Sequence, residues 1–398
     1  MTNLPQGWEV KKLEEIANIK GGKRLPKGEN LLDNNTKFAY IRVADFQDNG
    51  TINLQNIKFI NENTYNVLKN YKIYDDNLYI SIAGTIGKSG IIPKELNGAI
   101  LTENAVKLEY IQNNISNKFM YFFTLSNIFK TQIQTSTKIV AQPKLAITRL
   151  KQIQIPLPPL KEQERIVGIL DESFAKIDES IKILEQNLLN LDELMQSALQ
   201  KAFNPLKDNA KENYKLPQSW EWKSLEEISE NISAGGDKPK NCTESKTAKN
   251  QIPVYANGVN NNGLVGYTDK ATIIKPSLTI SARGTIGFVC IRKEPYFPIV
   301  RLISLIPCEN ILCLHYLYFC LNFFIAKGEG SSIPQLTIPK FKSLQIPLPP
   351  LKEQEQIAEH LDFVFEKAKA LKELYTKELK GYEELKQSLL DKAFKGEL

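Results

Sequence analysis

The chain repeats one twelve-residue phrase with a single mismatch. IPLPPLKEQERI occupies residues 155–166, and IPLPPLKEQEQI occupies residues 346–357, a shift of 191 residues. Two other phrases recur at shifts of 212 and 200 residues: LPQGWEVKKLEEI at 4–16 matches LPQSWEWKSLEEI at 216–228, and GTIG at 84–87 matches GTIG at 284–287. Because the shift is constant only after the Pro-rich phrase, we predict a duplicated frame that carries two globular parts of unequal length.

Length and composition narrow the class of protein. The 398 residues allow two or three domains, each with its own core. The first residues, MTNLPQGWEV, lack the basic stretch and apolar run of a signal peptide, and no run of eighteen apolar residues occurs. We therefore expect a soluble, cytoplasmic protein. Its five cysteines form no CxxC pair and it has only two histidines, which favours reduced thiols over disulfides or a metal site.

Charge is distributed unevenly along the chain. Residues 1–155 carry 20 Lys and Arg against 13 Asp and Glu, and residues 205–346 carry 17 against 12. By contrast, residues 156–204 carry 5 against 9, and residues 347–398 carry 9 against 11. The net charge of +6 therefore hides two basic globular parts and two acidic segments. Basic globular parts fit a polyanionic partner.

The two acidic segments are predicted to be long helices. After Pro159 the apolar residues recur at alternating steps of four and three, which is typical of a heptad seam: Ile166, Leu170, Phe174, Ile177, Ile181, Leu184, Leu188, Leu191, Met195 and Ala198. The helix is expected to end near Asn204 and Pro205. A second helix is predicted from Leu351 to about Phe394, with this seam: Leu361, Val364, Ala368, Leu371, Tyr375, Tyr382, Leu385 and Leu389.

Neither helix can bury its apolar stripe alone. Because the two helices have equal lengths and a whole folded domain lies between them, we predict an antiparallel coiled coil with an approximate two-fold axis. The globular parts mix β-rich stretches with Gly- and Asn-rich turns, and helical pattern is local there, as in 118–129 and 313–326. The fold class is therefore predicted as α+β, with two globular domains separated by the two helices.

The sequence lacks the motifs of known classes of DNA-modifying enzyme. Both Pro-Pro pairs are followed by leucine, so the Asn/Asp-Pro-Pro-aromatic motif of an amino-methyltransferase is absent. Gly87-Lys88-Ser89 resembles the end of a phosphate loop, but the required earlier glycine is Ile82. Metal-dependent cleavage by carboxylates stays open. A self-contained DNA methyltransferase or nuclease is therefore the alternative, and a scaffold unrelated to DNA is a third class.

The repeated residues resemble those of the specificity subunits of type I restriction-modification systems. The matching pieces are LPxxWxxxxLEEI, the TIG turn, IPLPPLKEQExI and a helix ending in KAF, in the family's order over the whole chain. The resemblance implies a non-catalytic subunit without cofactors, in which two target-recognition domains (1–155 and 205–346) alternate with two conserved spacer helices (156–204 and 347–398). It also implies that each domain reads one half of a bipartite double-stranded DNA site. The paired helices then act as a spacer and dock two methyltransferase subunits, to which restriction subunits can add.

The resemblance and the helix lengths together predict the kind of target. Unlike domains imply an asymmetric site. A helix pair about 60 Å long limits the separation of the domains to less than about two turns of duplex. We therefore predict a gapped site whose central bases are not read. Apolar residues beyond the seam, such as Ile183, Leu189 and Leu194, predict burial on a second side of the helices. A coiled coil without any docking role is the simpler alternative.

Loops are expected to supply the DNA contacts, because strands and apolar helices form the core. Arg and Lys bind phosphates or guanine edges, and Asn or Gln can pair with adenine edges. The candidates in the first domain are Lys23, Arg24, Arg42, Lys88, Lys138, Gln142 and Lys144. Those in the second domain are Lys238, Lys240, Asn257, Asn260, Arg283, Ser331, Ser332 and Gln335. The glycines of the GTIG phrases are predicted to form tight turns, and Trp8 and Trp220 to anchor packing.

Overall fold

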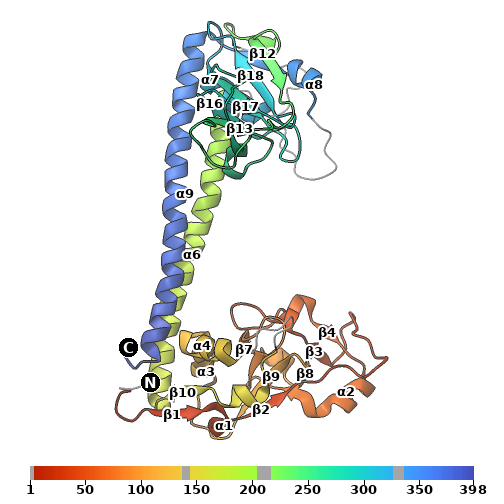
Figure 1. Ribbon diagram of the computed structural model, residues 1–398. Coiled ribbons are helices and arrows are strands. Elements are labelled where there is room, and N and C mark those ends of the chain that lie inside the picture. The colour runs from red at the N-terminus through yellow and green to blue at the C-terminus, as the bar shows by residue number, and fades with distance from the viewer. Residues whose placement is uncertain (1–3, 137–143, 204–216, 326–335) are drawn as a thin grey trace. The chain divides into compact units, whose positions relative to one another are not determined.

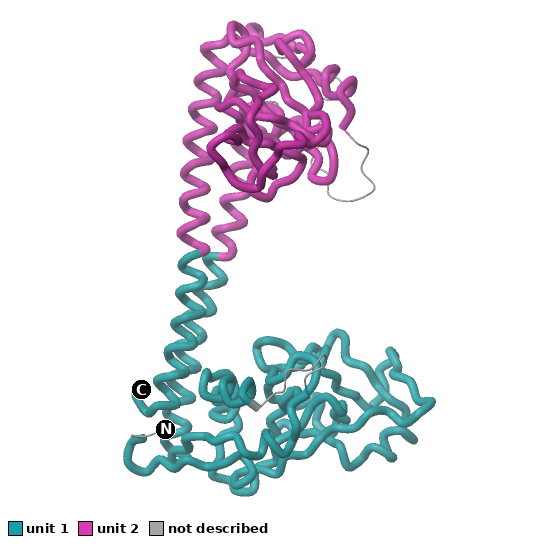
Figure 2. The backbone as a smooth tube through the Cα atoms, in the orientation of Figure 1, with its two compact units in different colours: residues 1–184, 377–398 teal, residues 185–376 magenta. Residues whose placement is uncertain are grey.

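The computed structural model describes residues 4–136, 144–203, 217–325 and 336–398 (Figure 1). The chain forms two compact units, which Figure 2 shows in different colours. Unit 1 comprises residues 1–184 and 377–398, and unit 2 comprises residues 185–376. Each unit combines one globular part with segments of both long helices. Within the described ranges, no helix combines the length and the apolar character needed to cross a membrane.

The globular part of unit 1 contains two four-stranded sheets. The first is antiparallel, in the order β2 (Ala17–Gly21), β9 (Ala105–Tyr110), β6 (Leu78–Ser81) and β7 (Ser89–Ile91). The second has the order β4 (Lys58–Phe59), β3 (Ala39–Ile41), β8 (Ala99–Leu101) and β5 (Lys72–Ile73), with β3 and β8 parallel. The helices here are α1 (Leu13–Ile16), α2 (Glu62–Leu68), α3 (Asn117–Leu125), α4 (Asn127–Ser136) and α5 (Ile147–Lys151). Short 3-10 turns lie at η1 (Val43–Asp45), η2 (Leu54–Asn56), η3 (Lys69–Tyr71) and η4 (Lys94–Leu96).

The globular part of unit 2 has the same strand order in its antiparallel sheet, and its second sheet matches the first three strands of the one in unit 1. Its antiparallel sheet is β12 (Ser229–Ala234), β18 (Ile303–Pro307), β15 (Ser277–Ile280) and β16 (Val289–Arg292). Its second sheet is β14 (Leu264–Thr268), β13 (Ile252–Tyr255) and β17 (Phe297–Pro298), with β13 and β17 parallel. Helices α7 (Leu314–Phe324) and α8 (Ile338–Lys342) and the 3-10 turn η5 (Asn260–Gly263) complete it. The predicted α+β class and the duplication are confirmed.

The local helical pattern predicted at residues 118–129 of the first globular part corresponds to two helices. Helix α3 ends at Leu125 and α4 begins at Asn127. Ser126 separates them, because its hydroxyl donates to the carbonyl oxygen of Phe123 (2.7 Å) and accepts from the amide of Phe129 (3.3 Å). A serine side chain that caps the next helix in this way competes with the continuous backbone ladder. In the second globular part, the predicted helix at 313–326 corresponds to α7.

The repeated phrases of each unit pair with one another. Strand β1 (Glu9–Lys12) lies antiparallel to β10 (Gln154–Leu157), and β11 (Glu221–Ser224) lies antiparallel to β19 (Gln345–Leu348). The register is the same in both pairs, because Glu9 is opposite Leu157 and Glu221 is opposite Leu348. The domain-opening phrase and the Pro-rich phrase therefore recur together because each is the other's partner.

Tryptophans of the opening phrase anchor these pairs, as predicted. Trp8 packs against the core of unit 1. Trp220 is buried, with 9% of its surface exposed, and its Nε1 donates to Oε1 of Glu353 at 3.0 Å. Glu353 lies in the first turn of the second long helix, so the indole connects the start of the domain to the helix that follows it.

The glutamine of each KEQE phrase joins its long helix to the adjacent domain. Gln163 is 1% exposed; its Oε1 accepts from the amide of Ser116 (2.9 Å), and its Nε2 donates to the carbonyl oxygens of Asn114 (3.1 Å) and Pro158 (2.9 Å). Gln354 is 0% exposed and makes the same three contacts, with the amide of Cys313 (2.9 Å) and the carbonyl oxygens of Ile311 (2.8 Å) and Pro349 (2.8 Å). Each glutamine thus fixes the segment that leads into the domain's apolar helix, α3 or α7.

The long helices have the predicted bounds. Helix α6 runs from Leu160 to Phe203, and α9 runs from Leu351 to Ala393. In unit 2 an ion pair joins Lys372 of α9 to Asp192 of α6, and in unit 1 another joins Lys386 to Asp178. Fourteen residues forward along α9 correspond to fourteen residues backward along α6. The two helices are therefore antiparallel in one register, as expected for a coiled coil.

Each domain core uses the start of one long helix and the end of the other. In unit 1, Ile166 and Leu170 of α6 join the core together with Phe394, which follows α9. The Phe394 ring lies 5.1 Å from the ring of Phe119 in α3, centroid to centroid. In unit 2, Phe203 at the end of α6 occupies the equivalent place, 5.4 Å from the ring of Tyr316 in α7. The phenylalanine of each repeated KAF phrase therefore packs in the core of the domain at which its helix ends.

The predicted seam of α9 is wrong at two positions. Leu371 and Leu385 are 38% and 45% exposed, whereas the neighbouring Lys372 and Lys386 face α6 and form the ion pairs. Lysine can occupy a seam because its aliphatic stem packs on apolar surface while the ammonium reaches a carboxylate. The predicted seam of α6 is confirmed, since its ten residues are all buried or half-buried.

Candidate nucleic-acid interface

Two segments predicted to bind DNA meet at one edge of unit 1. The Gly-Gly loop that follows β2 binds the turn between β8 and β9. The amide of Gly22 donates to the carbonyl oxygen of Ala105, and the amide of Lys23 donates to that of Leu101, both at 2.9 Å. The turn itself is closed by the amide of Ala105, which donates to the carbonyl oxygen of Thr102 at 3.2 Å.

The TIG loop, residues 82–88, reaches the same turn. The amides of Ile82 and Ala83 both donate to the carbonyl oxygen of Asn104, at 2.8 and 3.3 Å. On its other side, Ile82 accepts from the amide of Leu145 at 2.9 Å. The Gly-Gly loop, the β8–β9 turn, the TIG loop and the segment that begins at Lys144 therefore converge on one edge.

Unit 2 builds the same edge with different residues. The amide of Gly235 donates to the carbonyl oxygen of Leu302 at 2.8 Å, which ties the Gly-Gly loop to the turn between β17 and β18. The amide of Leu336 donates to the carbonyl oxygen of Ala282 (3.2 Å), which brings the segment after residue 335 to the TIG loop. We name these two regions, each made of a Gly-Gly loop, a turn, a TIG loop and a returning segment, the loop edges.

Close approach explains the glycine in each basic loop. A Cβ on Gly22 would lie 2.1 Å from the carbonyl oxygen of Thr102, and one on Gly235 would lie 2.6 Å from the amide nitrogen of Ile299. Only glycine lets the loop lie against the turn at these distances. The predicted tight turns of the two GTIG phrases are confirmed, because all four glycines have positive φ: Gly84, Gly87, Gly284 and Gly287.

Seven of the predicted contact residues are exposed, six of them in or next to the loops of the loop edges and Asn260 in the 3-10 turn η5. In unit 1 they are Lys23, Arg24 and Lys144, and in unit 2 they are Lys238, Lys240, Asn260 and Arg283. Lys88 is half-buried, and its ammonium pairs with the fully exposed carboxylate of Asp48 at 2.8 Å. Lys138, Gln142, Ser331, Ser332 and Gln335 lie outside the described residues.

An acidic residue accompanies the basic ones at the loop edge of unit 1. Glu103, in the β8–β9 turn, accepts from the Nε of Arg24 at 2.7 Å and from the hydroxyl of Thr102 at 2.9 Å. Burial alone would raise the pKa of Glu103, but these hydrogen bonds outweigh it and lower the pKa of the carboxyl below its usual value. The carboxylate partly neutralises this edge.

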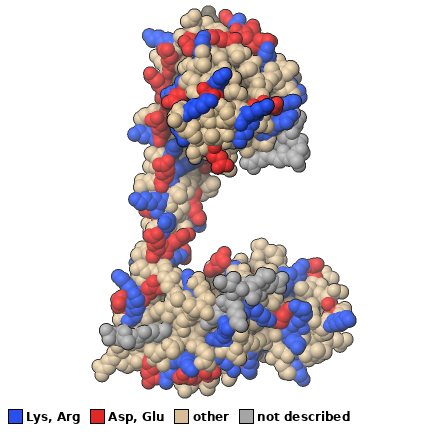
Figure 3. Space-filling model, in the orientation of Figure 1, with Lys and Arg blue, Asp and Glu red and all other residues tan. Residues whose placement is uncertain are grey.

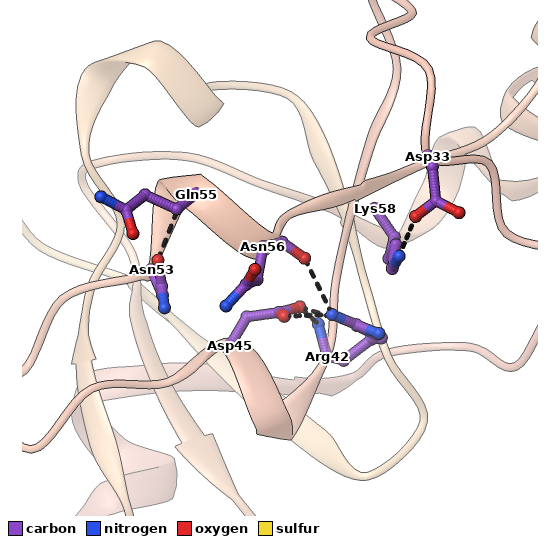
Figure 4. A network of polar contacts seen from close by, with 7 residues as sticks. All are labelled: Asp33, Arg42, Asp45, Asn53, Gln55, Asn56 and Lys58. Carbon is purple, nitrogen blue, oxygen red and sulfur yellow. Dashed lines mark hydrogen bonds and ion pairs between the residues drawn. The ribbon is translucent and has the colours of Figure 1, made fainter.

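Arg42 and Asn257 are held by internal contacts. Figure 4 shows Arg42 turned onto Asp45, with Nη2 2.5 Å from Oδ1 and 3.0 Å from the carbonyl oxygen of Asn56. Asp45 is 1% exposed, so the guanidinium neutralises a buried carboxylate. Asn257 donates to the carbonyl oxygen of Val300 (2.7 Å) and accepts from the amide of Ala282 (2.8 Å). Both side chains therefore brace the loops through contacts within the protein.

Sequence reasoning missed one exposed basic residue of the unit 2 edge. Arg301 lies in the turn between β17 and β18, and both Val300 and Arg301 have positive φ. The surrounding sequence, PIVRLI, has none of the Gly, Asn or Asp residues that mark such turns. Only the backbone hydrogen bonds reveal that a turn is present.

The charges visible on the surface agree with the segment counts. On the face drawn in Figure 3, acidic side chains are frequent along the long helices, and Lys and Arg side chains are spread over both globular parts. Within the described ranges, no three His, Cys, Asp or Glu side chains are grouped so that they could hold a metal ion.

Comparison with known proteins identifies the family. The model of the type I restriction modification DNA specificity domain matches residues 5–189 and again 217–380. A putative type I specificity subunit of Mycoplasma pneumoniae is 29% identical over 357 residues, which cover 88% of this chain and 87% of the relative. The putative MjaX specificity subunit of Methanocaldococcus jannaschii is 24% identical over 420 residues, 99% of this chain and 94% of the relative.

Solved structures show the same fold. One, on complex assembly and conformational transition of the type I R-M system, contains a chain with a TM-score of 0.81 and 20% identity, both chains being covered completely. The HsdS subunit from Thermoanaerobacter tengcongensis has a TM-score of 0.64 and 20% identity over 100% of this chain and 98% of that one. None of these matches supports a self-contained methyltransferase or nuclease. With the specificity domain matched twice and over most of its length, the chain belongs to the family of type I restriction-modification DNA specificity subunits.

Proposed function

We propose that each loop edge reads one half of an asymmetric, gapped DNA site. The observation that carries the proposal is that two units of one topology bring the same four loops together but furnish them with different side chains. A shared frame gives both edges the same way of approaching a duplex. Different side chains on that frame read different bases.

The side chains suit the two tasks of DNA recognition. Lys238 and Lys240, exposed after Gly236, can grip phosphates and release counterions. Arg24 and Arg283 are exposed, and a guanidinium can bind a guanine edge or a phosphate. Loops rather than a helix present these groups, so the recognised bases depend on side-chain orientation within each loop and on the shape of the duplex.

The paired helices are proposed to set the gap and to dock two methyltransferase subunits, with restriction subunits joining through that complex. A helix of 44 residues is about 66 Å long, which spans roughly two turns of duplex. Ile183, Leu189 and Leu194 of α6 are 55%, 58% and 52% exposed. Exposed apolar residues on a helix mark a surface for a protein partner. The proposed recognition domains are residues 1–155 and 205–346, and the proposed compartment is the cytoplasm, where the target DNA lies.

The test is a methylation assay with defined partners. The purified chain, its cognate methyltransferase subunit and a labelled methyl donor are mixed with a duplex library, and the methylated positions are sequenced. We expect methylation only when both proteins are present, at one bipartite sequence whose two halves differ. Methylation by the chain alone, or by the methyltransferase subunit without sequence preference in the presence of the chain, would contradict the proposal.

The spacer role has its own test. Seven residues are inserted into α6 and seven at the facing position of α9, so that the antiparallel register is kept. We expect the two half-sites to stay the same while the number of unread bases between them increases. An unchanged gap in a folded, active complex would show that the helices do not set it.

A further inference from the structure

The most unusual backbone of the described residues lies in the turn between β17 and β18. Val300 and Arg301 have φ of 54° and 61°, and the amide of Leu302 donates to the carbonyl oxygen of Ile299 at 3.1 Å. Positive φ at both central residues defines a type I′ turn, which strongly prefers Asn and Gly. A β-branched residue such as Val300 is an outlier there. This turn is therefore strained.

The structure holds the strained turn from two sides. The amides of Val300 and Arg301 donate to the carbonyl oxygens of Gly236 and Gly235, both at 2.8 Å. On the other side, the side-chain Nδ2 of Asn257 donates to the carbonyl oxygen of Val300 at 2.7 Å. The Oδ1 of the same side chain accepts from the backbone amide of Ala282 in the TIG loop. Strain of this kind persists only when the surroundings over-determine it, and it is concentrated at functional sites.

The strained turn carries an exposed arginine. Arg301 is exposed, and among the residues that the structure describes its side chain has no hydrogen-bond or ion-pair partner. Val300 beside it is 51% exposed, so neither side chain serves the core. Packing thus gives no reason for a valine and an arginine at positions that favour Asn and Gly.

The equivalent turn of unit 1 is built in the opposite way. Its central residues, Glu103 and Asn104, are not among those with positive φ, and Glu103 is paired with Arg24. Both turns share one contact with the Gly-Gly loop, in which the amide of Gly22 or Gly235 donates to the carbonyl oxygen of the last turn residue, Ala105 or Leu302. The other contacts differ, because the amides of Val300 and Arg301 donate to the loop only in unit 2. Among the described residues, the strained backbone and the unpaired guanidinium therefore belong to the turn of unit 2 and not to that of unit 1, which points to a role in what unit 2 alone must recognise.

We propose that Arg301 is a specificity-determining residue that reads a guanine in the half-site bound by unit 2. The inference rests on the proposed function and adds a residue and a base to it. Arginine reads guanine by donating two hydrogen bonds to O6 and N7 in the major groove. The turn that carries this exposed side chain is bound by the Gly-Gly loop on one side and, through Asn257, is connected to the TIG loop at Ala282 on the other. Its fixed backbone limits the conformational entropy that binding must cost.

The experiment compares four variants in the complete complex with the methyltransferase subunit: Arg301→Ala, Arg301→Lys, Val300→Asn and Lys293→Ala. Lys293 is the control. It is exposed on the same domain but follows the end of β16 that lies opposite Ser277, at the edge of the sheet away from the TIG loop. Methylated sites are sequenced from a library randomised over both half-sites, and each variant is also melted.

Arg301→Ala is expected to lose the preference for guanine at one position of the second half-site by about 5- to 150-fold, with the first half-site unchanged. Arg301→Lys keeps the positive charge but cannot donate two parallel hydrogen bonds. It should therefore reduce the preference for guanine at the same position while retaining duplex affinity. Lys293→Ala should keep the wild-type target. Val300→Asn should keep the target and raise the melting temperature, because asparagine tolerates positive φ.

Three results would overturn the inference. The first is a folded Arg301→Ala complex with the wild-type target. The second is a loss of preference spread evenly over both half-sites, which would make Arg301 a phosphate contact. The third is a lower melting temperature for Val300→Asn, which would show that the turn is not strained. A wild-type complex that methylates no specific sequence would instead refute the proposed function, so the two failures are distinguishable.

Discussion

The loop edges of the two units share a backbone plan and differ in charge. In unit 1 the turn carries Glu103, which is paired with Arg24, whereas in unit 2 the same turn carries Val300 and Arg301, whose side chain has no polar partner in the part of the chain that the structure describes. One hydrogen bond that docks the Gly-Gly loop on the turn is nevertheless the same, from Gly22 to Ala105 in unit 1 and from Gly235 to Leu302 in unit 2. The two units thus share the place where the loops meet but differ in the side chains that these loops expose. The contacts that are equal in the two units lie where each long helix begins. They are made by Gln163 and Gln354, which we call the frame glutamines.

The largest effect is expected at the frame glutamines. Gln163→Leu and Gln354→Leu each leave a buried amide and two carbonyl oxygens without their partner, which should cost about 2–4 kcal/mol of unfolding free energy. The cost should be nearly equal in the two units because the three contacts are the same. Urea unfolding followed by circular dichroism measures it.

The exposed Gln186 of α6 provides the matched control. Gln186→Leu should change the unfolding free energy by less than about 0.5 kcal/mol. If Gln163→Leu proved as mild as this control while Gln354→Leu did not, the two frames would not be equivalent, and the comparison between the units would fail at its foundation.

The next effect concerns the basic loop of unit 2. Replacing Lys238 and Lys240 by alanine should reduce the salt dependence of duplex binding by about 2 in the slope of log K against log salt, if each contacts one phosphate. The measurement is a titration of the complex with its cognate duplex at several salt concentrations. The double replacement of Lys270 and Lys293, both exposed, removes the same charge elsewhere on the domain. If both double variants reduced the slope of log K against log salt equally, the lysines would act through the overall positive charge of the domain and not through phosphate contacts.

A smaller effect distinguishes the two tryptophan anchors. Trp220→Phe loses the hydrogen bond to Glu353 and should cost about 1–2 kcal/mol more than the same change at Trp8. Within the described residues, the indole of Trp8 makes no recorded hydrogen bond, so its replacement loses packing alone. Thermal melting of both variants at one protein concentration tests this. Equal costs would show that the bond to Glu353 contributes no net stability.

The frame could be predicted from the sequence because its signals are local and repeated. The heptad spacing and the prolines at the helix entrance predicted the ends of α6 and α9 to within a residue or two. The same spacing failed for part of the α9 seam. Leu371 and Leu385 matched the apolar pattern, yet Lys372 and Lys386 face α6 because Asp192 and Asp178 lie across the seam. The heptad periodicity locates apolar residues, but it cannot predict that a lysine occupies the seam because an aspartate lies across from it.

The loop edges could be predicted only in outline. The Gly-Gly and GTIG phrases indicated two of the loops that meet in each unit. Arg42 looked like a contact residue because its charge is visible in the sequence, whereas the burial of Asp45 three residues later is not. Arg301 was missed for the opposite reason, because its turn has no turn-forming residue. Where tertiary hydrogen bonds impose a conformation against local preference, local preference cannot reveal it.

The smallest predicted effect tests the acidic partner in the unit 1 turn. Because hydrogen bonds from Arg24 and Thr102 lower the pKa of Glu103, the carboxylate stabilises the folded state above the pKa of the unfolded chain, about 4.5. That contribution is lost as the pH falls through the folded pKa. Glu103→Gln should therefore lower the melting temperature slightly at pH 7, and the difference should disappear once the pH lies below the folded pKa. The same variant frees Arg24 from its carboxylate, so the complex should bind non-cognate duplex more tightly at low salt. If instead the variant changed the bases read in the first half-site, Glu103 would itself read a base, and the turns of both units would be reading elements.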